Sequence, residues 1–234
     1  MPTKAKPEIL NFYQKIPKKF LDTAHNPNFD VHGLKIPFRM LLIGPSGSGK
    51  SNTVLNILQV FHSTFTTCTI VTRNKQEPLY QWLETRIPAT HLQITEGIET
   101  IPDLDSYDKR KNHIIIFDDL LLENNLKSIG EYFIRARKLN VSCIFLSQSY
   151  FSPDKHFKLL RRNCNYLVIK RGCSIRDLNL ILREYSLDLT KKDFVKLYQD
   201  ATNNMQDFLL IDVDAPPEKR FRKNFEVIPM ENVK

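Results

Sequence analysis

A glycine-rich stretch after residue 43 limits what this chain can fold into more than any other feature. The run from Gly44 to Ser51 (GPSGSGKS) fits the pattern G-x-x-x-x-G-K-[ST], and it lies between the apolar run RMLLI and the amphipathic run NTVLNILQVF. Glycines let successive backbone N–H groups point into one concavity, where they and the first turn of a helix hold phosphate oxygens. The stretch therefore predicts a strand, a phosphate-binding loop and a helix, in that order.

The loop residues have expected contacts with a bound nucleotide. Lys50 is expected to reach the β and γ phosphates, and the hydroxyl of Ser51 to bind a Mg²⁺ ion that bridges them. A stretch that resembles a guanine-specificity box, Asn74 to Glu77 (NKQE), ends in Glu and precedes the acidic strand described below, so we favour ATP over GTP. The expected cofactors are ATP and Mg²⁺. The expected nucleotide-binding residues are Gly44, Pro45, Ser46, Gly47, Ser48, Gly49, Lys50 and Ser51.

Outside this loop, short apolar runs alternate with amphipathic stretches, a pattern typical of a parallel sheet covered by helices. The predicted fold class is α/β: a P-loop NTPase with a mostly parallel central sheet flanked by helices. Ser174 and Thr190 are the expected N-caps of two of these helices. The sequence predicts strands at 38–43, 67–72, 91–95, 113–117, 141–147, 165–170 and 207–212, and helices at 50–62, 77–85, 124–139, 154–162, 174–184 and 190–201.

The length of 234 residues favours one compact domain with short tails. Residues 1–36 hold four prolines and a Lys-rich start, and we interpret them as an N-terminal arm. Residues 37–213 form the predicted P-loop ATPase domain. Residues 214–234 are polar and basic, and we expect them to leave the core as a C-terminal tail.

Two carboxylates end the apolar run HIIIFDD, at the edge of the sheet where an open α/β fold meets its nucleotide. Asp118 is expected to hold the water shell of Mg²⁺. Asp119 then has a separate task, because a hydrolase needs a carboxylate that orients and deprotonates the attacking water. The alternative is that the pair only caps the next helix, since LLENNLKSIGEYF has a helical pattern.

Another apolar strand, Val141 to Leu146, ends in polar residues of which Gln148 is the main candidate. We expect its amide to lie beside the γ phosphate, where it could sense the phosphate or position the water. Polar residues also end many strands with no such role. Tyr80, Trp82 and Leu83 have helical spacing, and core packing accounts for them better than a ligand site.

The charge of the chain indicates a polyanionic partner. Lys plus Arg minus Asp plus Glu is 34 − 26 = +8, which favours nucleic acid or an anionic membrane surface. The apolar runs are far shorter than the roughly 20 residues of a membrane-spanning helix, and the N-terminus has no apolar signal region. We therefore expect an intracellular protein, not a secreted one, and its four cysteines to be reduced and mostly buried.

The motifs GPSGSGKS, IIIFDD, IRARKLNVSCIFLSQS and LLRRNCNYLVIKRG, in this order, resemble the FtsK/HerA superfamily. Within it, the compact size, the two aspartates and the LSQS strand are similar to the genome-packaging ATPases of large double-stranded DNA viruses, virophages and polinton-type elements. The resemblance covers roughly residues 36 to 212. It implies a RecA/FtsK-like sheet, a homo-oligomeric ring of five or six subunits, ATP hydrolysis that moves double-stranded DNA, capsid proteins as partners and no membrane.

The resemblance also implies roles for single residues. Lys50, Asp119, Gln148 and Arg137 are the expected catalytic residues, with Arg137 acting as an arginine finger on the neighbouring subunit and Arg135 as the second candidate. It further implies a location inside the host cell, in the cytoplasm or a viral factory, or in the virion. The candidate DNA-binding residues are Lys109, Arg110, Lys111, Lys155, Lys158, Arg161 and Arg162, with a further basic segment from Lys219 to Lys223.

Two other functions stay open at this point. One is a P-loop nucleotide or nucleoside kinase, in which Lys155 to Arg162 would form a lid over the phosphates. Asp119 and Gln148 count against it, because a kinase needs no carboxylate to position water. The other is a nucleotide-dependent switch with little turnover.

Overall fold

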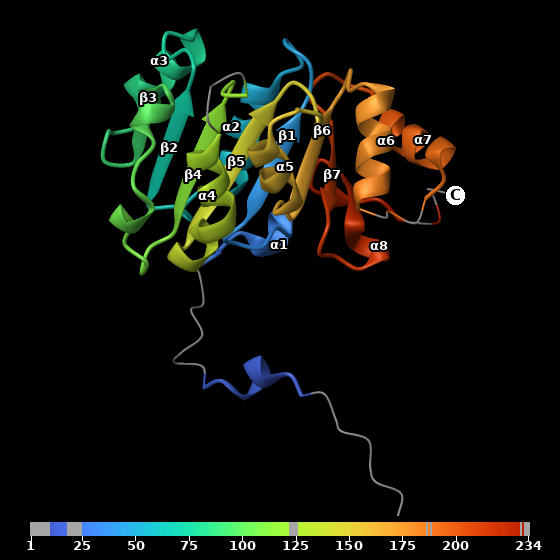
Figure 1. The fold of residues 1–234 in the computed structure, drawn as a ribbon, viewed down its shortest axis with the longest axis horizontal. Helices are drawn as coiled ribbons and strands as arrows, with labels where there is room; N and C mark the ends of the chain where they lie inside the picture. The colour runs from blue at the N-terminus through green and yellow to red at the C-terminus, as the bar shows by residue number, and fades with distance from the viewer. Residues whose placement is uncertain are drawn as a thin grey trace, which may run out of the picture.

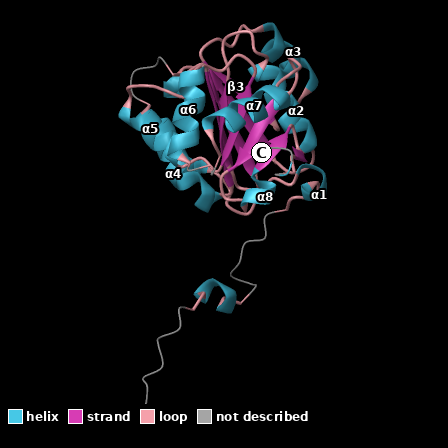
Figure 2. Cartoon of the chain, turned by 90° about the vertical axis from the view of Figure 1, so that its right-hand side faces the viewer, coloured by secondary structure: helices cyan, strands magenta, loops and turns pink. Residues whose placement is uncertain are grey.

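The computed structural model describes residues 10–17, 25–121, 126–185, 187, 189–229 and 231. Within these residues the strands form one nine-stranded sheet with the order β3-β2-β4-β5-β1-β6-β7-β8-β9. The six strands from β3 to β6 in this order pair in parallel, and β7, β8 and β9 continue the sheet antiparallel. Helices cover both faces (Figures 1 and 2), so the predicted α/β fold with a mostly parallel sheet is confirmed.

The seven predicted strands lie close to their predicted positions, as do the predicted helices apart from the one at 124–139, whereas α1, α8, β8 and β9 were not predicted. The strands are β1 Arg39–Ile43, β2 Thr67–Thr72, β3 Leu92–Glu96, β4 His113–Asp118, β5 Val141–Ser147, β6 Tyr166–Lys170, β7 Phe208–Asp212, β8 Phe221–Lys223 and β9 Glu226–Val227. The α-helices are α1 Phe29–His32, α2 Lys50–Val60, α3 Pro78–Arg86, α4 Lys127–Arg135, α5 Lys155–Arg162, α6 Ile175–Glu184, α7 Lys191–Ala201 and α8 Pro217–Arg220. Short 3₁₀ helices are η1 Phe12–Lys15, η3 Ile98–Thr100, η4 Leu104–Ser106 and η5 Ala136–Leu139.

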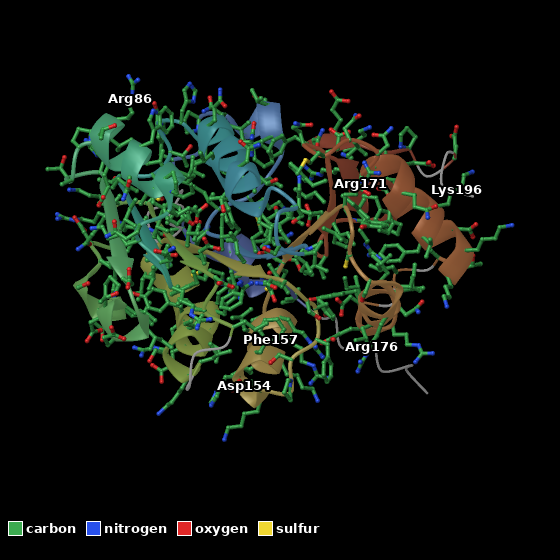
Figure 3. The ribbon with its side chains drawn as sticks, turned by 90° about the horizontal axis from the view of Figure 1, so that it is seen from above. Arg86, Asp154, Phe157, Arg171, Arg176 and Lys196 are labelled. Carbon is green, nitrogen blue, oxygen red and sulfur yellow. The ribbon has the colours of Figure 1, made fainter. Side chains whose placement is uncertain are left out.

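Helix starts follow local side-chain chemistry. The side chain of Ser174 accepts a hydrogen bond from the backbone N–H of Asp177, and Thr190 accepts one from that of Asp193, so both predicted N-caps are confirmed. Asp154 caps α5 in the same way, and the next turn directs Phe157 into the core (Figure 3). The helix predicted at 124–139 is shorter: α4 ends at Arg135 and η5 follows, while residues 124 and 125 lie outside the described residues.

The sheet separates two apolar cores because successive side chains of a strand point to opposite faces. In β1, Leu41 and Ile43 pack with residues of α4 to α7 on one face. Met40 and Leu42 pack with residues of α2 and α3 on the other face. β4 and β5 lie at the centre and are buried along their whole length, which explains why they read as continuous apolar runs in the sequence.

The predicted C-terminal tail is wrong for residues 217–227. β8 pairs antiparallel with β7, and Phe221 is 1% exposed. The guanidinium of Arg222 is buried, forms an ion pair with Asp212 at 3.3 Å and donates to the carbonyl oxygen of His32 at 2.9 Å. This segment looked solvated because it is basic, but burial of Phe221 and pairing of the Arg222 charge hold it on the sheet.

The boundary of the predicted N-terminal arm also moves. Leu34 has no exposed surface and packs in the core on the α2 side of the sheet, and His32 is buried beside it. The carbonyl oxygen of His25 accepts a hydrogen bond from Asn112, so contact with the domain begins by residue 25. The η1 segment lies apart from the sheet in Figures 1 and 2.

The four cysteines are free thiols, as expected. Cys143 and Cys164 are buried, and burial raises the pKa of Cys68 to about 12. Across the described ranges, no helix is both long and apolar enough to cross a bilayer.

Candidate nucleotide site

The loop between β1 and α2 has the backbone that a phosphate-binding loop needs. Gly47 and Gly49 adopt φ angles of 73° and 80°, in the left-handed region that favours glycine, and α2 begins at the next residue, Lys50. The N–H of Gly44 donates to the carbonyl oxygen of Ser147 at 3.1 Å. The start of the loop is therefore fixed to the end of β5.

Two glycines permit close packing between this loop and β6. A Cβ on Gly44 would lie 2.6 Å from the Cβ of Lys170, which is closer than side-chain carbons approach in real proteins. A Cβ on Gly172, where φ is +85°, would lie 2.9 Å from Cγ of Pro45. The loop therefore rests directly on the end of β6, and this contact explains why the first position of the motif is glycine.

Lys50 lies inside the loop. Its ammonium donates to the carbonyl oxygens of Gly44 at 2.9 Å and Pro45 at 3.1 Å. Burial lowers the pKa of Lys50, and the charges of Asp118 and Asp119 oppose that effect. The amine thus faces the acidic pair, and the structure brings together the two motifs that the sequence identified separately.

Asp118 ends β4 as a buried carboxylate with one strong hydrogen-bond partner. The hydroxyl of Tyr80, on α3, donates to Asp118 Oδ2. Burial raises the pKa of Asp118, whereas the Tyr80 hydrogen bond lowers it. For Tyr80, burial and the charge of Asp118 raise the pKa, and a hydrogen bond with Ser51 opposes that rise. Tyr80 therefore contacts both expected Mg²⁺-binding residues. The sequence pattern assigned it to core packing because helical spacing reports burial and not the partner of the hydroxyl.

Asp119 is exposed next to Asp118 and has φ = 54°, so the backbone turns sharply between the two aspartates. The side-chain amide of Gln148, after β5, donates to Asp119 Oδ1 at 3.3 Å. The two strand ends that the sequence proposed are thus neighbours, as expected for adjacent parallel strands. No helix begins at the pair, because α4 starts at Lys127. The alternative that these aspartates only cap that helix is wrong.

A third carboxylate lies near this pair and was missed in the sequence. Glu77 is the N-cap residue of α3, and burial together with the charges of Asp118 and Asp119 raises its pKa. It follows the end of β2, which pairs with β4, so it belongs to the same edge of the sheet. Glu77 follows the predicted strand at 67–72, and this position is the signal by which the sequence could have identified it as a site residue.

The donor set suits Mg²⁺ bound together with a nucleotide. In the part of the chain that the structure describes, no group of three or more His, Cys, Asp or Glu side chains could hold a metal alone. Mg²⁺ in nucleotide sites uses one or two protein oxygens and takes the rest from phosphates and water. The Ser51 hydroxyl and the Asp118 carboxylate, both beside Tyr80, fit that requirement.

Arg137 and Arg135 lie far from this site in the same chain. Both precede β5, whose seven residues at about 3.3 Å each separate them from the loop edge by roughly 20 Å. Arg137 is exposed on η5. Arg135 lies 3.9 Å from Asp105, and both side chains are largely exposed. Neither guanidinium belongs to the nucleotide site of its own chain.

The candidate DNA-binding residues divide into two groups. Lys109, Arg110 and Lys111 are exposed in the loop before β4, where Arg110 pairs with Asp108 at 3.0 Å. Lys155 and Lys158 are exposed on α5. Arg162, at the end of α5, is 63% exposed and lies 3.5 Å from Glu184.

The expectation that Arg161 binds DNA is wrong. Its guanidinium forms an ion pair with Glu184 at 3.1 Å, donates to the carbonyl oxygen of Tyr150 at 3.0 Å and lies over the ring of Tyr150. The residue is 9% exposed. α5 is amphipathic, and Arg161 follows Leu160 onto the side that packs against the sheet, where its charge is satisfied internally.

Comparisons with known proteins agree with this geometry. The family model described as "Poxvirus A32 protein" matches residues 28–222. No curated protein matches the chain.

Solved structures share the fold. The genome packaging NTPase B204 from Sulfolobus turreted icosahedral virus 2, in complex with ATP-gammaS, is similar with a TM-score of 0.58 and 13% identity, over 83% of this chain and 100% of that one. The DNA-packaging ATPase B204 from Sulfolobus turreted icosahedral virus gives 0.57 and 13%, over 87% and 100%. The cytoplasmic domain of the Thermomonospora curvata Type VII secretion ATPase EccC gives 0.51 and 15%, over 82% of this chain and 25% of that one.

Proposed function

Because the chain belongs to the Poxvirus A32 protein family, we propose that it hydrolyses ATP to move double-stranded DNA into a viral capsid. The sequence resemblance to viral packaging ATPases of the FtsK/HerA superfamily is confirmed, and the chain is an ATPase of that class. The observation that carries the proposal is the hydrogen bond between Gln148 and Asp119 beside the phosphate-binding loop. It joins a water-orienting carboxylate to an amide that can respond to the γ phosphate.

The loop residues bind the phosphates in this proposal. The backbone N–H groups of the loop and the first turn of α2 face the phosphate oxygens. Lys50 exchanges its two carbonyl acceptors, Gly44 and Pro45, for phosphate oxygens, which are better acceptors because they are charged. Ser51 and Asp118 would hold Mg²⁺, which neutralises charge on the β and γ phosphates when bound.

Asp119 is the proposed general base. Its exposed carboxylate accepts a hydrogen bond from Gln148 through Oδ1, which leaves Oδ2 to accept from the attacking water and take its proton. Gln148 holds the orientation of the carboxylate. The hydroxyl of Ser149, the residue after Gln148, donates to the carboxylate of the buried Asp177 at the start of α6. Tyr150, which follows Ser149, is buried. A change at Gln148 can thus be transmitted to α6.

The position of Arg137 supports a role in trans. Arg137 precedes β5, so it lies at the end of the strands opposite to its own phosphate loop, and it is exposed. It can therefore stabilise a transferring phosphoryl group only in a neighbouring subunit. We propose a homo-oligomeric ring of five or six subunits, with capsid proteins as partners, that acts inside the infected cell.

The proposed phosphate contacts to DNA are Lys155, Lys158 and Arg162 on α5, together with Lys109 to Lys111 in the loop before β4.

ATP hydrolysis measured with and without duplex DNA tests the proposal. We expect phosphate release that duplex DNA stimulates. Transfer of the phosphoryl group to a nucleoside or nucleotide would identify the kinase alternative, and binding without turnover would identify the switch. We expect Lys50→Ala to abolish nucleotide binding and Asp119→Asn to bind ATP but hydrolyse it poorly. Normal turnover by Asp119→Asn would exclude the general-base role.

Mixed assemblies test Arg137. Arg137→Ala subunits supply an intact acidic pair, and Asp119→Asn subunits supply an intact arginine. If Arg137 acts on its neighbour, the mixture recovers activity that neither variant has alone. Arg135→Ala, mixed in the same way, is the matched control. Absence of recovery with Arg137→Ala would make this residue structural.

DNA binding at several salt concentrations tests the α5 contacts. Replacing both Lys155 and Lys158 by Ala should reduce the slope of log affinity against log salt by about two, because each phosphate contact contributes about 0.9. The matched control replaces the exposed pair Lys191 and Lys192 on α7 by Ala, which should leave the slope unchanged. Equal slopes for all three proteins would exclude the α5 contacts.

A further inference from the structure

The geometry of the phosphate site limits where the rest of a nucleotide can lie. The acidic pair and Gln148 follow β4 and β5, which lie on one side of β1 in the sheet, and β6 and β7 lie on the other side. A triphosphate whose γ end faces the acidic pair therefore directs its nucleoside toward β6 and β7. This step rests on the proposed function, because it takes the acidic pair as the hydrolytic end of the site.

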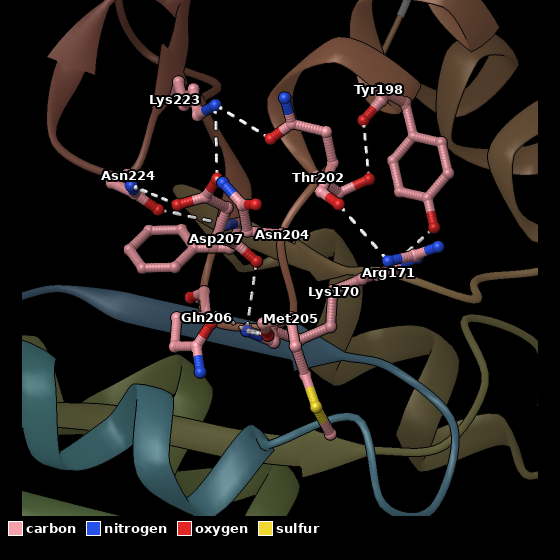
Figure 4. Close-up of polar contacts among 12 residues, drawn as sticks. Lys170, Arg171, Tyr198, Thr202, Asn204, Met205, Gln206, Asp207, Lys223 and Asn224 are labelled. Atoms are coloured by element: carbon pink, nitrogen blue, oxygen red, sulfur yellow. Dashed lines mark hydrogen bonds and ion pairs between the residues drawn. The ribbon is translucent and has the colours of Figure 1, made fainter.

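A loop of residues 202–207, which we call the α7–β7 loop, stands at that position. A Cβ placed on Gly49 would have the carbonyl oxygen of Met205 as its nearest neighbour, at 4.0 Å. Met205 is 57% exposed, an unusual position for a methionine. Figure 4 shows its side chain extending from the α7–β7 loop toward the loop between β1 and α2. An apolar, polarizable side chain thus lies beside the phosphate loop.

Lys170 fixes the distance between these two loops. Its ammonium donates to the carbonyl oxygens of Met205, Gln206 and Asp207 at 2.9, 3.1 and 3.0 Å, which uses all three of its protons (Figure 4). Its Cβ, with the hydroxyl oxygen of Ser48, is one of the two atoms that most closely exclude a side chain at Gly44. Lys170 has no exposed surface, and burial of an ammonium is costly unless it is fully hydrogen-bonded. The contact therefore holds only when the α7–β7 loop has this conformation.

A second set of contacts holds the end of the α7–β7 loop. Asp207 accepts hydrogen bonds from Asn204 at 2.9 Å and Asn224 at 3.0 Å, and its carboxylate lies 3.2 Å from the ammonium of Lys223. Lys223 and Asn224 come from β8 and the turn after it. The C-terminal segment that the sequence assigned to a tail thus supports this loop.

We propose that the α7–β7 loop is the wall that receives the adenosine of ATP. The thioether and methyl group of Met205 cover one face of the adenine, a contact that sulfur and aromatic rings form favourably. The exposed side chain of Gln206 lies next to it along the loop. Lys170 is a positioning residue, because it touches no ligand and acts by holding Met205 at a set distance from the phosphates.

The test compares ATP with inorganic tripolyphosphate, both with Mg²⁺, by calorimetric titration of the full chain. Tripolyphosphate occupies only the phosphate half of the site, so the ratio of the two affinities measures the contribution of the nucleoside. Met205→Ala should weaken ATP binding by about two- to tenfold and leave tripolyphosphate binding unchanged. Met205→Leu should retain most of the ATP affinity. The control Ile134→Ala removes a similarly exposed apolar side chain from α4 and should change neither.

Lys170→Met gives an independent measurement, because it keeps the length of the side chain and removes the three hydrogen bonds. We expect it to lower ATP affinity and to leave tripolyphosphate binding unchanged. Equal losses of affinity for both ligands in Lys170→Met, or unchanged ATP affinity in Met205→Ala, would overturn the proposed adenosine contact. If the wild-type chain binds tripolyphosphate as tightly as ATP, only the proposed adenosine contact is wrong. If it binds neither ligand, the proposed function is wrong, and the adenosine contact with it.

Discussion

Tyr80→Phe removes one hydroxyl and so separates the contacts of Tyr80 with the proposed Mg²⁺-binding residues from its packing in the core. The ring is 3% exposed and packs in the core on the α2 side of the sheet, and phenylalanine keeps that packing. The hydroxyl contacts Asp118 and Ser51, the two residues proposed to hold Mg²⁺. The substitution therefore leaves Asp118 Oδ2 without its donor and leaves the Asp118 side chain free to rotate.

The expected magnitudes follow from these contacts. A hydrogen bond to a charged group contributes roughly 1.5–3 kcal/mol, and Asp118 is only 7% exposed, so the free energy of unfolding should fall by about 2 kcal/mol. Mg²⁺ must then order the carboxylate that Tyr80 had held. Fixing one side chain costs about 0.5–1.5 kcal/mol, which corresponds to an increase of about two- to tenfold in the half-saturating Mg²⁺ concentration.

Urea unfolding measures the first quantity, and titration of a fluorescent ATP analogue with Mg²⁺ measures the second. Tyr132→Phe is the matched control, because Tyr132 is also buried but its hydroxyl donates to a neutral acceptor, the carbonyl oxygen of Pro102, at 2.6 Å. This control should lose about 1 kcal/mol and keep the wild-type Mg²⁺ dependence. The reasoning is refuted if Tyr80→Phe binds Mg²⁺ like the wild type, or if both variants shift it equally.

Three further substitutions test other parts of the structure. Arg161→Met removes one of the two arginine partners of Glu184 and the donor to the carbonyl oxygen of Tyr150, so urea unfolding should show a loss of about 2 kcal/mol while DNA affinity stays unchanged. Lower DNA affinity in this variant would mean that Arg161 contacts DNA. Burial lowers the pKa of His32 to about 4, so the unfolded chain takes up the proton first as pH falls below 6.5. The free energy of unfolding should therefore fall by about 3 kcal/mol from pH 7 to pH 4, and His32→Gln should remove most of that slope in urea titrations at each pH. Gly172→Ala places a methyl group 2.9 Å from Cγ of Pro45 at a positive φ. It should lower the affinity for nucleotide markedly and the melting temperature only slightly. Unchanged nucleotide affinity would mean that the phosphate loop adapts to the methyl group.

Sequence reasoning located the elements well where local chemistry decides them. The strands from β1 to β7 begin and end within about a residue of their predicted positions, and Ser174 and Thr190 cap the expected helices. A cap or a glycine at positive φ acts through its nearest neighbours in the chain. For the same reason the phosphate loop, with Gly47 and Gly49 in left-handed conformations, could be recognised from eight residues.

Partners of charged and hydroxyl groups could not be found in this way. Arg161 and Arg222 look in the sequence like solvated charges, yet each is buried with a carboxylate from another element. Tyr80 and Lys170 look like members of an amphipathic helix and a strand end, yet one contacts Asp118 and the other holds the α7–β7 loop. Such contacts depend on which elements the fold brings together.

The sequence alone determined the phosphate loop, the acidic strand end and the order of strands and helices, because hydrophobic period, glycine conformation and capping are properties of short segments. Only the tertiary structure decided that β8 joins the sheet, that Arg161 faces inward and that Asp119 meets Gln148. Those outcomes depend on strand pairing and on the cost of burying unpaired charge, which are set by residues far apart in the chain.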